Sequence, residues 1–108
     1  KGESGYAGAP GRTLLHLING RTYRMSFIAA SEDGEGRVKI VLKDAKSMAT
    51  IYDSYEADGG WINISKEPRT YTRLYTHNAD SEMDVRLEFD VGSRQQILYL
   101  DKVELIRH

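Results

Sequence analysis

The sequence predicts an all-β fold, an antiparallel β-sandwich, from three observations. Apolar and polar residues alternate within many short segments, as they do in strands with one buried face. These segments recur about every ten residues and are separated by turn-forming residues, a spacing typical of sandwiches and barrels. No segment carries a helical apolar stripe of useful length. A chain of 108 residues suits one domain and not two, so residues 1–108 are expected to form a single domain.

The first third of the chain contains the strongest turn signal. Residues 1–12 are rich in Gly and Ala and predict an irregular lead-in. A strand is predicted at residues 13–18 and another at residues 22–30. Asn19-Gly20 lies between them, and Asn-Gly between two apolar runs is a strong hairpin signal. We therefore expect these two strands to pair with each other.

The middle of the chain predicts three further strands. The turn at residues 31–36 precedes residues 37–44, where Val38, Ile40 and Leu42 alternate with polar neighbours. Residues 49–56 form a plausible strand that carries Tyr52 and Tyr55. Asp58-Gly59-Gly60 then interrupts the chain before a short strand at residues 61–65. In that strand Trp61 and Asn63 share one face, and Ile62 and Ile64 share the other.

The last third predicts three strands, at residues 69–77, 85–91 and 96–106. The final strand changes phase, because Leu98 and Leu100 have one parity and Val103 and Leu105 have the other. A slip of one residue near Asp101-Lys102 is what a β-bulge produces.

Composition excludes several classes of function. The formal net charge is −1, which gives no electrostatic reason to expect nucleic acid or an anionic membrane as partner. The chain has no cysteine, and it has no apolar run near the ~20 residues that a membrane helix needs. It lacks the sequence signatures of zinc proteases, serine hydrolases, phosphate loops and dinucleotide sites. Seven of the ten aromatic side chains outside histidine are tyrosine, which favours a binding surface over a reaction centre.

Four ordered motifs carry a resemblance to a known family. They are the Leu17–Phe27 run with Gly20, Thr22, Tyr23 and Ser26; Ile-Ser-Lys-Glu-Pro-Arg-Thr-Tyr at 64–71; Arg-Leu-Glu-Phe at 86–89 with Gly92; and Leu-Tyr-Leu-Asp-Lys-Val-Glu-Leu at 98–105. Together they resemble carbohydrate-binding modules of the family four, nine and twenty-two type. The resemblance implies a jelly-roll that binds soluble β-linked glycans, such as xylan or β-glucan, in a cleft on its concave sheet. It also implies a secreted or cell-surface bacterial protein in which the module is covalently linked to a xylanase catalytic domain.

The chain departs from the family pattern in two places. Nothing before Tyr6 matches the usual N-terminal strand, so the chain resembles a shortened module, such as one inserted in a host enzyme. The family's structural calcium takes a carboxylate from that strand and another from the residue that Asp101 matches, so no calcium is assigned. In addition, Pro68 stands where the family has Trp.

Sugar binding needs aromatic faces that cover pyranose rings and planar polar groups that bond hydroxyls. Trp61 is the best aromatic candidate, although a single Trp also fits a core position. The resemblance adds Tyr6, which otherwise belongs to the lead-in, together with Tyr52 and Tyr55. Tyr52 and Tyr55 have opposite parity, so a regular strand turns only one of them to the cleft, and Tyr52 is preferred.

Polar candidates come from strand faces that point away from the core. Asn63 shares the face of Trp61, whereas Arg24, Glu88 and Asp90 lie on non-core faces of strands that line the cleft in the family. Each of the last three residues, considered alone, is more typical of an ordinary charged residue on a solvated surface. The sequence thus predicts a non-catalytic glycan-binding module with no resident cofactor and no catalytic or metal-binding residue. The alternative is a structural or protein-interaction sandwich of a multidomain secreted protein, because fold alone does not determine function.

Overall fold

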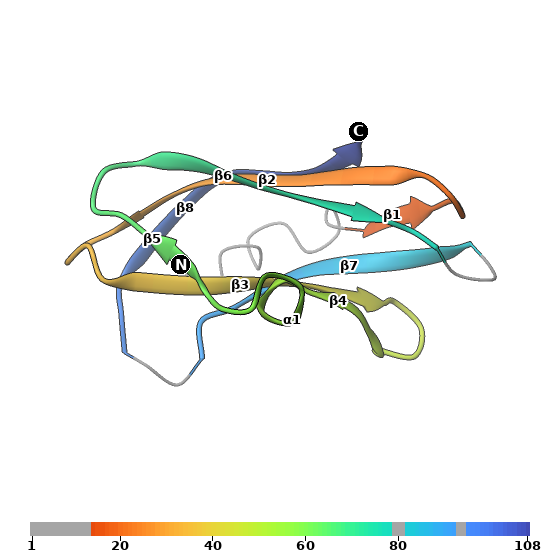
Figure 1. The fold of residues 1–108 in the computed structure, drawn as a ribbon, viewed down its shortest axis with the longest axis horizontal. Helices are drawn as coiled ribbons and strands as arrows, with labels where there is room; N and C mark the ends of the chain where they lie inside the picture. The colour runs from red at the N-terminus through yellow and green to blue at the C-terminus, as the bar shows by residue number, and fades with distance from the viewer. Residues whose placement is uncertain (1–13, 79–81, 93–94) are drawn as a thin grey trace.

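The computed structural model describes residues 14–78, 82–92 and 95–108, which form two antiparallel sheets packed face to face (Figure 1). The predicted all-β sandwich is thereby confirmed. Its elements in chain order are β1 (Leu14–Leu17), β2 (Thr22–Ser31), β3 (Gly36–Asp44), β4 (Thr50–Asp53), α1 (Ser54–Asp58), β5 (Ile62–Ile64), β6 (Arg69–Thr76), β7 (Met83–Asp90) and β8 (Leu98–Arg107). The helix found in this part of the chain has five residues, too few to cross a bilayer.

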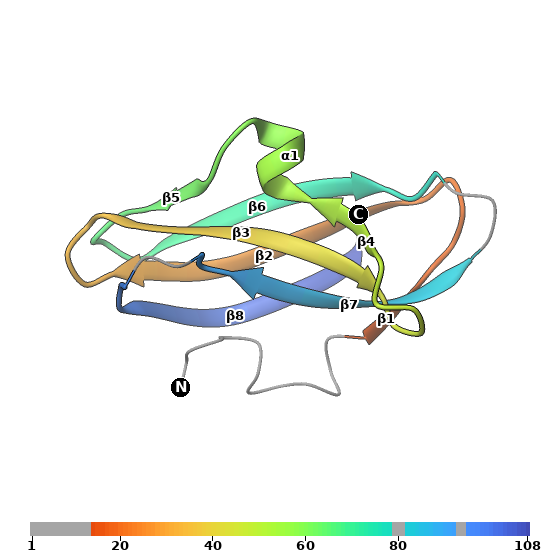
Figure 2. The same cartoon turned by 90° about the horizontal axis from the view of Figure 1, so that it is seen from below.

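One sheet has five strands and the other has three. The larger sheet runs β1-β7-β3-β4, and β5 adds to the same edge of β3 as β4 does. The smaller sheet runs β6-β2-β8, with the long strand β2 at its centre. Figure 2 shows α1 rising between β4 and β5, beside β6. Every strand pair is antiparallel.

The core lies between the sheets and follows the predicted alternation. From β3, Val38, Ile40 and Leu42 are fully buried, as their parity predicts. From β2, Phe27 contributes the central ring, which stacks on Tyr71 of β6 at 5.5 Å between centroids and meets Phe89 of β7 edge-on at 5.0 Å. Other members of the core cluster are Leu17, Tyr23, Met25, Ala29, Ile62, Ile64, Val85 and Leu87. Both sheets therefore bury one apolar face against the other.

The predicted hairpin at Asn19-Gly20 is wrong. The chain does turn there, since Gly20 has a φ of 87° and the Arg21 N–H donates to the carbonyl of Ile18 at 3.1 Å. However, β1 pairs with β7, whereas β2 pairs with β6 and β8. The turn carries the chain from one sheet to the other, so that Leu17 and Tyr23 reach the same core from opposite layers.

The predicted strand at residues 49–56 ends early. β4 stops at Asp53, whose carboxylate accepts the N–H of Tyr55 and caps α1 at its N-terminus. Ser54 is fully buried, and its hydroxyl accepts the N–H of Ile40 at 2.9 Å. That N–H lies in the gap between the stretches of β3 that pair with β5 and β4. The helix thus supplies the hydrogen bond that a continuous edge strand would have made.

The predicted bulge in the last strand is confirmed. Ser26 of β2 faces Glu104, while Ile28 faces Asp101, so β8 holds one extra residue between them. Lys102 sits at this point with a φ of 51°. The bulge explains why Leu100 and Val103 both pack against the core despite their opposite parity.

Candidate functional site

Trp61 lies at the outer surface of the five-stranded sheet, just before β5, and is partly exposed. Its ring reaches across to the segment that follows β7. A Cβ built on Gly92 would lie 3.0 Å from the Trp61 Cη2 atom and 3.3 Å from Cζ2. Gly92 also has a φ of 73°, a conformation that favours glycine. The absence of a side chain at Gly92 therefore lets the indole lie against the backbone there.

Arg37 and Tyr55 complete the surroundings of the indole. The Arg37 guanidinium carbon lies 5.1 Å from the ring centroid of Trp61, within cation–π distance. The Tyr55 ring meets the indole edge-on, with 5.4 Å between centroids. Asn63 stands directly opposite Arg37 in the β3–β5 ladder and is exposed. Because residues directly opposite each other share a face of an antiparallel sheet, both side chains point to this outer surface.

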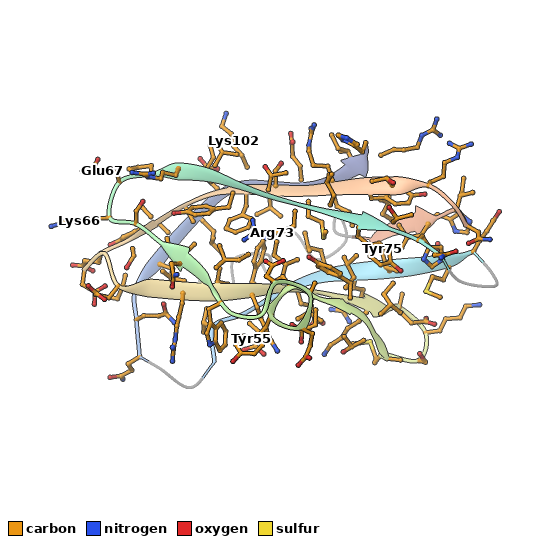
Figure 3. The ribbon with its side chains drawn as sticks, in the orientation of Figure 1. Tyr55, Lys66, Glu67, Arg73, Tyr75 and Lys102 are labelled. Atoms are coloured by element: carbon orange, nitrogen blue, oxygen red, sulfur yellow. The ribbon has the colours of Figure 1, made fainter. Side chains whose placement is uncertain are left out.

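The helix α1 holds Tyr55 on this surface. Figure 3 shows Tyr55 on the outer side of the layer that contains β3, whereas Arg73 and Tyr75 point into the space between the sheets. Tyr55 is 39% exposed, so it offers part of its ring to solvent. The Lys39 ammonium lies 5.9 Å from its centroid. Aromatic and polar groups from β3, α1 and β5 thus gather on one continuous surface, which we call the Trp61 face: Arg37, Lys39, Tyr55, Trp61 and Asn63.

Lys39, a member of the Trp61 face, forms an ion pair with Asp53 at the end of β4. The Lys39 Nζ atom lies 2.8 Å from the Asp53 Oδ2 atom, and the two side chains are only 22% and 18% exposed. The hydrogen bond to Asp53 raises the pKa of Lys39 and outweighs desolvation, which by itself would lower that pKa. Burial acts to raise the pKa of Asp53, but hydrogen bonds from Lys39 and from the Tyr55 N–H outweigh it and leave that pKa lowered. Both groups therefore stay charged across the neutral range.

A second ion pair continues the same surface along β3. Lys43 Nζ lies 3.2 Å from Glu88 Oε1 of β7. Val41 stands between Lys39 and Lys43 on this outer face and faces both Asp53 and Glu88 across the ladders. Although the alternation predicts an outward residue, Val41 is only 6% exposed. The two ion pairs flank Val41 on this face, where lysine stems can cover apolar surface while their charged ends stay in water.

The structure brings together some of the residues that the sequence singled out. Trp61, Tyr55 and Asn63 meet on the Trp61 face, with Glu88 and Asp90 farther along the same side of the sheet. Asp90 is exposed, and its carboxylate accepts the Gly92 N–H at 2.8 Å.

Two other predicted residues, Tyr52 and Arg24, do not join this group. Tyr52 faces Leu42 in the ladder and therefore points between the sheets, where its ring lies 5.5 Å from that of Tyr75. Burial accordingly raises the pKa of Tyr52. Arg24 lies on the outer face of the three-stranded sheet, on the opposite side of the sandwich, 3.9 Å from Glu104. Tyr6 lies outside the described residues.

Sequence reasoning missed two members of this surface, Arg37 and Lys39, and also Gly92, which lies against the Trp61 ring. The outward parity of Lys39 was visible in the alternation of residues 37–44. Nothing local, however, shows that β5 pairs with the start of β3, which is what places Arg37 beside Asn63. Gly92 resembled an ordinary turn glycine until the position of the indole gave it a second role.

Two other features of the described residues offer less to a ligand. A hollow of about 600 Å³ at one end of the sandwich is lined by Glu32, Asp33, Gln95, Gln96 and Ile97, without an aromatic ring. Asp101, the residue matched to the family's calcium ligand, is exposed, and its carboxylate accepts the Lys102 N–H. In the described part of the chain, no three His, Asp or Glu side chains are arranged as metal ligands.

Similarity to known proteins is limited to structure. No protein-family model matches the chain, and no curated protein matches it. The chain is similar to a solved structure described as "CBM4 structure and function", with a TM-score of 0.69 and 22% sequence identity. The match covers 88% of this chain but only 58% of that chain, so this chain spans less than two thirds of its length. At this level of identity the likeness establishes the fold.

Proposed function

We propose that this chain is a non-catalytic carbohydrate-binding module whose glycan lies along the Trp61 face. The observation that carries the proposal is the pair formed by Trp61 and Tyr55, two touching aromatic rings that both remain partly open to solvent. The likeness to a CBM4 structure supports the same class of function. We infer a β-linked plant polysaccharide as ligand, with xylan as the first candidate and mixed-linked β-glucan as the second.

The Trp61 face has the two properties that sugar recognition needs. Aromatic rings cover the apolar faces of pyranose rings, and Trp61 and Tyr55 supply them. Amide and charged groups hydrogen-bond hydroxyls, and Asn63 provides an exposed amide beside the rings. Farther along β3, Glu88 offers carboxylate oxygens that its ion pair with Lys43 holds in place.

The proposed role is targeting and not catalysis. A module linked to a glycoside hydrolase such as a xylanase keeps that enzyme near its polymer and raises the local concentration of substrate. Such a partner domain acts on polysaccharide outside the cell, so we infer a secreted or cell-surface bacterial protein.

Native affinity electrophoresis tests the proposal. The parent chain should be retarded by soluble arabinoxylan or by mixed-linked β-glucan. Trp61→Ala and Tyr55→Ala should each weaken retardation by about tenfold or more, as loss of a central aromatic contact does at binding surfaces. Circular dichroism spectra would confirm that each variant is folded.

Tyr99→Ala is the matched control for these two variants. Tyr99 is 59% exposed, but it belongs to the three-stranded sheet, where it lies on β8 directly opposite Ala30 of β2. Its removal should leave retardation unchanged. Equal loss in Tyr99→Ala would place the glycan elsewhere, and no retardation of the parent by any glycan of the panel would contradict the proposal.

One observation favours a protein-interaction domain as the second candidate. The outer face of the three-stranded sheet exposes Leu74 at 50% and Ile106 at 39%, and both flank Arg24 across β2. Exposed apolar side chains that lie together on a sheet suit a protein partner. If the parent chain is silent toward glycans, this function becomes the better conclusion.

A further inference from the structure

The Arg37 guanidinium is the one cationic group of the Trp61 face without an anionic partner among the described residues. Lys39 pairs with Asp53, and farther along β3 Lys43 pairs with Glu88. Arg37 shows no side-chain hydrogen bond or ion pair to any residue of the described ranges, only its contact with the Trp61 ring. A charge on a binding surface that the protein itself does not neutralise is available to a ligand.

The surroundings of Arg37 hold its guanidinium in a defined position. Its Nε atom is buried and has no hydrogen-bond partner, and among the described residues it is the only buried side-chain nitrogen or oxygen in this state. The terminal nitrogens also lack a partner but are not among the buried atoms, so they reach solvent. The backbone N–H of Arg37 donates to Gln96 Oε1 at 2.8 Å, and the side chain lies against the indole. An ordered fork of donors beside an aromatic ring is therefore presented outward.

We propose that the glycan bound at the Trp61 face carries a uronic acid, whose carboxylate pairs with Arg37. This inference rests on the proposed glycan-binding function and refines its ligand class. A planar carboxylate matches the guanidinium fork and can take two parallel N–H···O bonds. Asn63, directly opposite Arg37, is placed to bond a hydroxyl of the same sugar. A neutral chain would leave the outward nitrogens without an anionic acceptor.

Titration calorimetry with matched ligands tests the inference. The probes are xylohexaose, a xylo-oligosaccharide that carries one glucuronic acid branch, and the methyl ester of that branched sugar. The ester has the same shape but no charge. We expect the acid to bind at least about tenfold more tightly than its ester, because hydrogen bonds between charged groups are stronger than those between neutral ones. Raising NaCl to about 0.5 M should shrink this preference, since exposed charges are screened by salt.

Two substitutions locate the preference. Arg37→Gln should abolish the advantage of the acid over the ester, and because both ligands are measured on the same variant, a general change in its glycan affinity cancels from the comparison. Arg21→Gln removes the same charge from the turn between β1 and β2 and should keep the full preference, because that turn and the start of β3 lie at opposite ends of the sandwich (Figure 1). The comparison of acid with ester in the parent chain needs no variant, so equal binding of the two would overturn the inference even if Arg37→Gln fails to fold.

The outcomes separate the two proposals. If the neutral sugar binds and the acid and ester bind equally, glycan binding stands and the role of Arg37 is wrong. If the acid is preferred but Arg37→Gln keeps the preference, another group recognises the carboxylate and the inference is overturned. If none of the three sugars binds, the inference fails together with xylan as ligand, and retardation by β-glucan then decides whether glycan binding itself survives.

Discussion

His16 sits between two carboxylates on the outer surface of β1 and β7. Its Nε2 atom lies 2.8 Å from Glu82 Oε1, and its Nδ1 atom lies 2.8 Å from Asp84 Oδ1. The hydrogen bond to Glu82, followed by the one to Asp84, raises the pKa of His16 above 6.5. The protonated ring therefore joins the strand β1 to its neighbour electrostatically.

This arrangement predicts a pH-dependent contribution to stability. Because the folded-state pKa is raised, the contribution is fully present below pH 6.5 and is lost as pH rises through the folded-state value. The parent chain should have a higher melting temperature than His16→Gln at acidic pH, and the two should converge at alkaline pH. Thermal melts followed by circular dichroism across this range would measure the difference. A gap that widens with pH would contradict the assignment.

The close contact between Gly92 and Trp61 leads to a second prediction for a single residue. Gly92→Ala places a Cβ 3.0 Å from the Trp61 ring and forces alanine into a positive φ. We expect a stability loss of about 1–2 kcal/mol from the backbone conformation, and weaker glycan retardation because the indole must move. Gly20→Ala is the matched control, since Gly20 has a φ of 87° but no atom within 4 Å of the added Cβ. It should lose similar stability and keep glycan binding, as urea melts and affinity gels would show.

At the scale of the element, the short helix α1 holds the edge of the larger sheet together. Its first residue, Ser54, accepts the Ile40 N–H in the gap between β5 and β4. Its last residue, Asp58, accepts Arg73 Nε at 2.7 Å and ties the helix to β6 of the other sheet. The element that carries Tyr55 is thus fixed to both layers.

Removal of the Ser54 hydroxyl should therefore be costly for so small a change. Ser54→Ala leaves the buried Ile40 N–H without a partner, and we expect a loss of about 1–3 kcal/mol in the free energy of unfolding. Ser47→Ala removes a hydroxyl that accepts a turn N–H at 3.2 Å on an exposed residue, where water can replace it, and should cost little. Urea denaturation of both variants would compare them. Equal effects would show that the ladder gap does not depend on Ser54.

At the scale of the whole molecule, stability depends on contacts between the sheets. Phe27 is 1% exposed and touches rings from both layers. Phe27→Ala should lower the free energy of unfolding by about 3–5 kcal/mol, which is a large part of the total for a small domain. Leu74→Ala, on a side chain that is 50% exposed, should stay within about 0.5 kcal/mol of the parent. Guanidinium melts would measure both, and similar midpoints would contradict a core centred on Phe27.

Features that depend on neighbouring residues were predicted correctly, whereas features that depend on pairings between distant residues were not. The parity of Val38, Ile40 and Leu42 and the slip at Lys102 are properties of neighbouring residues, and both were predicted. The partner of β1 was predicted wrongly, because Asn19-Gly20 specifies a reversal of the chain but not which strands pair. Tyr55 was assigned to a strand because a helix of five residues is too short to show a periodic pattern.

The same distinction between local and long-range interactions applies to the candidate site. Trp61 and Asn63 could be placed on one face from their spacing, because strand periodicity is local. Their combination with Arg37, and the separation of Arg24 from them, depend on which strands share a sheet. Alternation shows that Arg24 points away from the core, but it cannot show on which of the two outer faces of the sandwich Arg24 lies.

The all-β class, most strands with their inward faces, and the bulge in β8 can thus be predicted from the amino-acid sequence alone. Each of these follows from burial of apolar side chains at a period of two and from turn chemistry within a few residues. The folded chain is needed to show the strand order, the sheet to which each strand belongs, and the contact of Trp61 with Gly92. These depend on pairings between residues far apart in the chain, which are selected by how well the whole core packs and not by any short stretch.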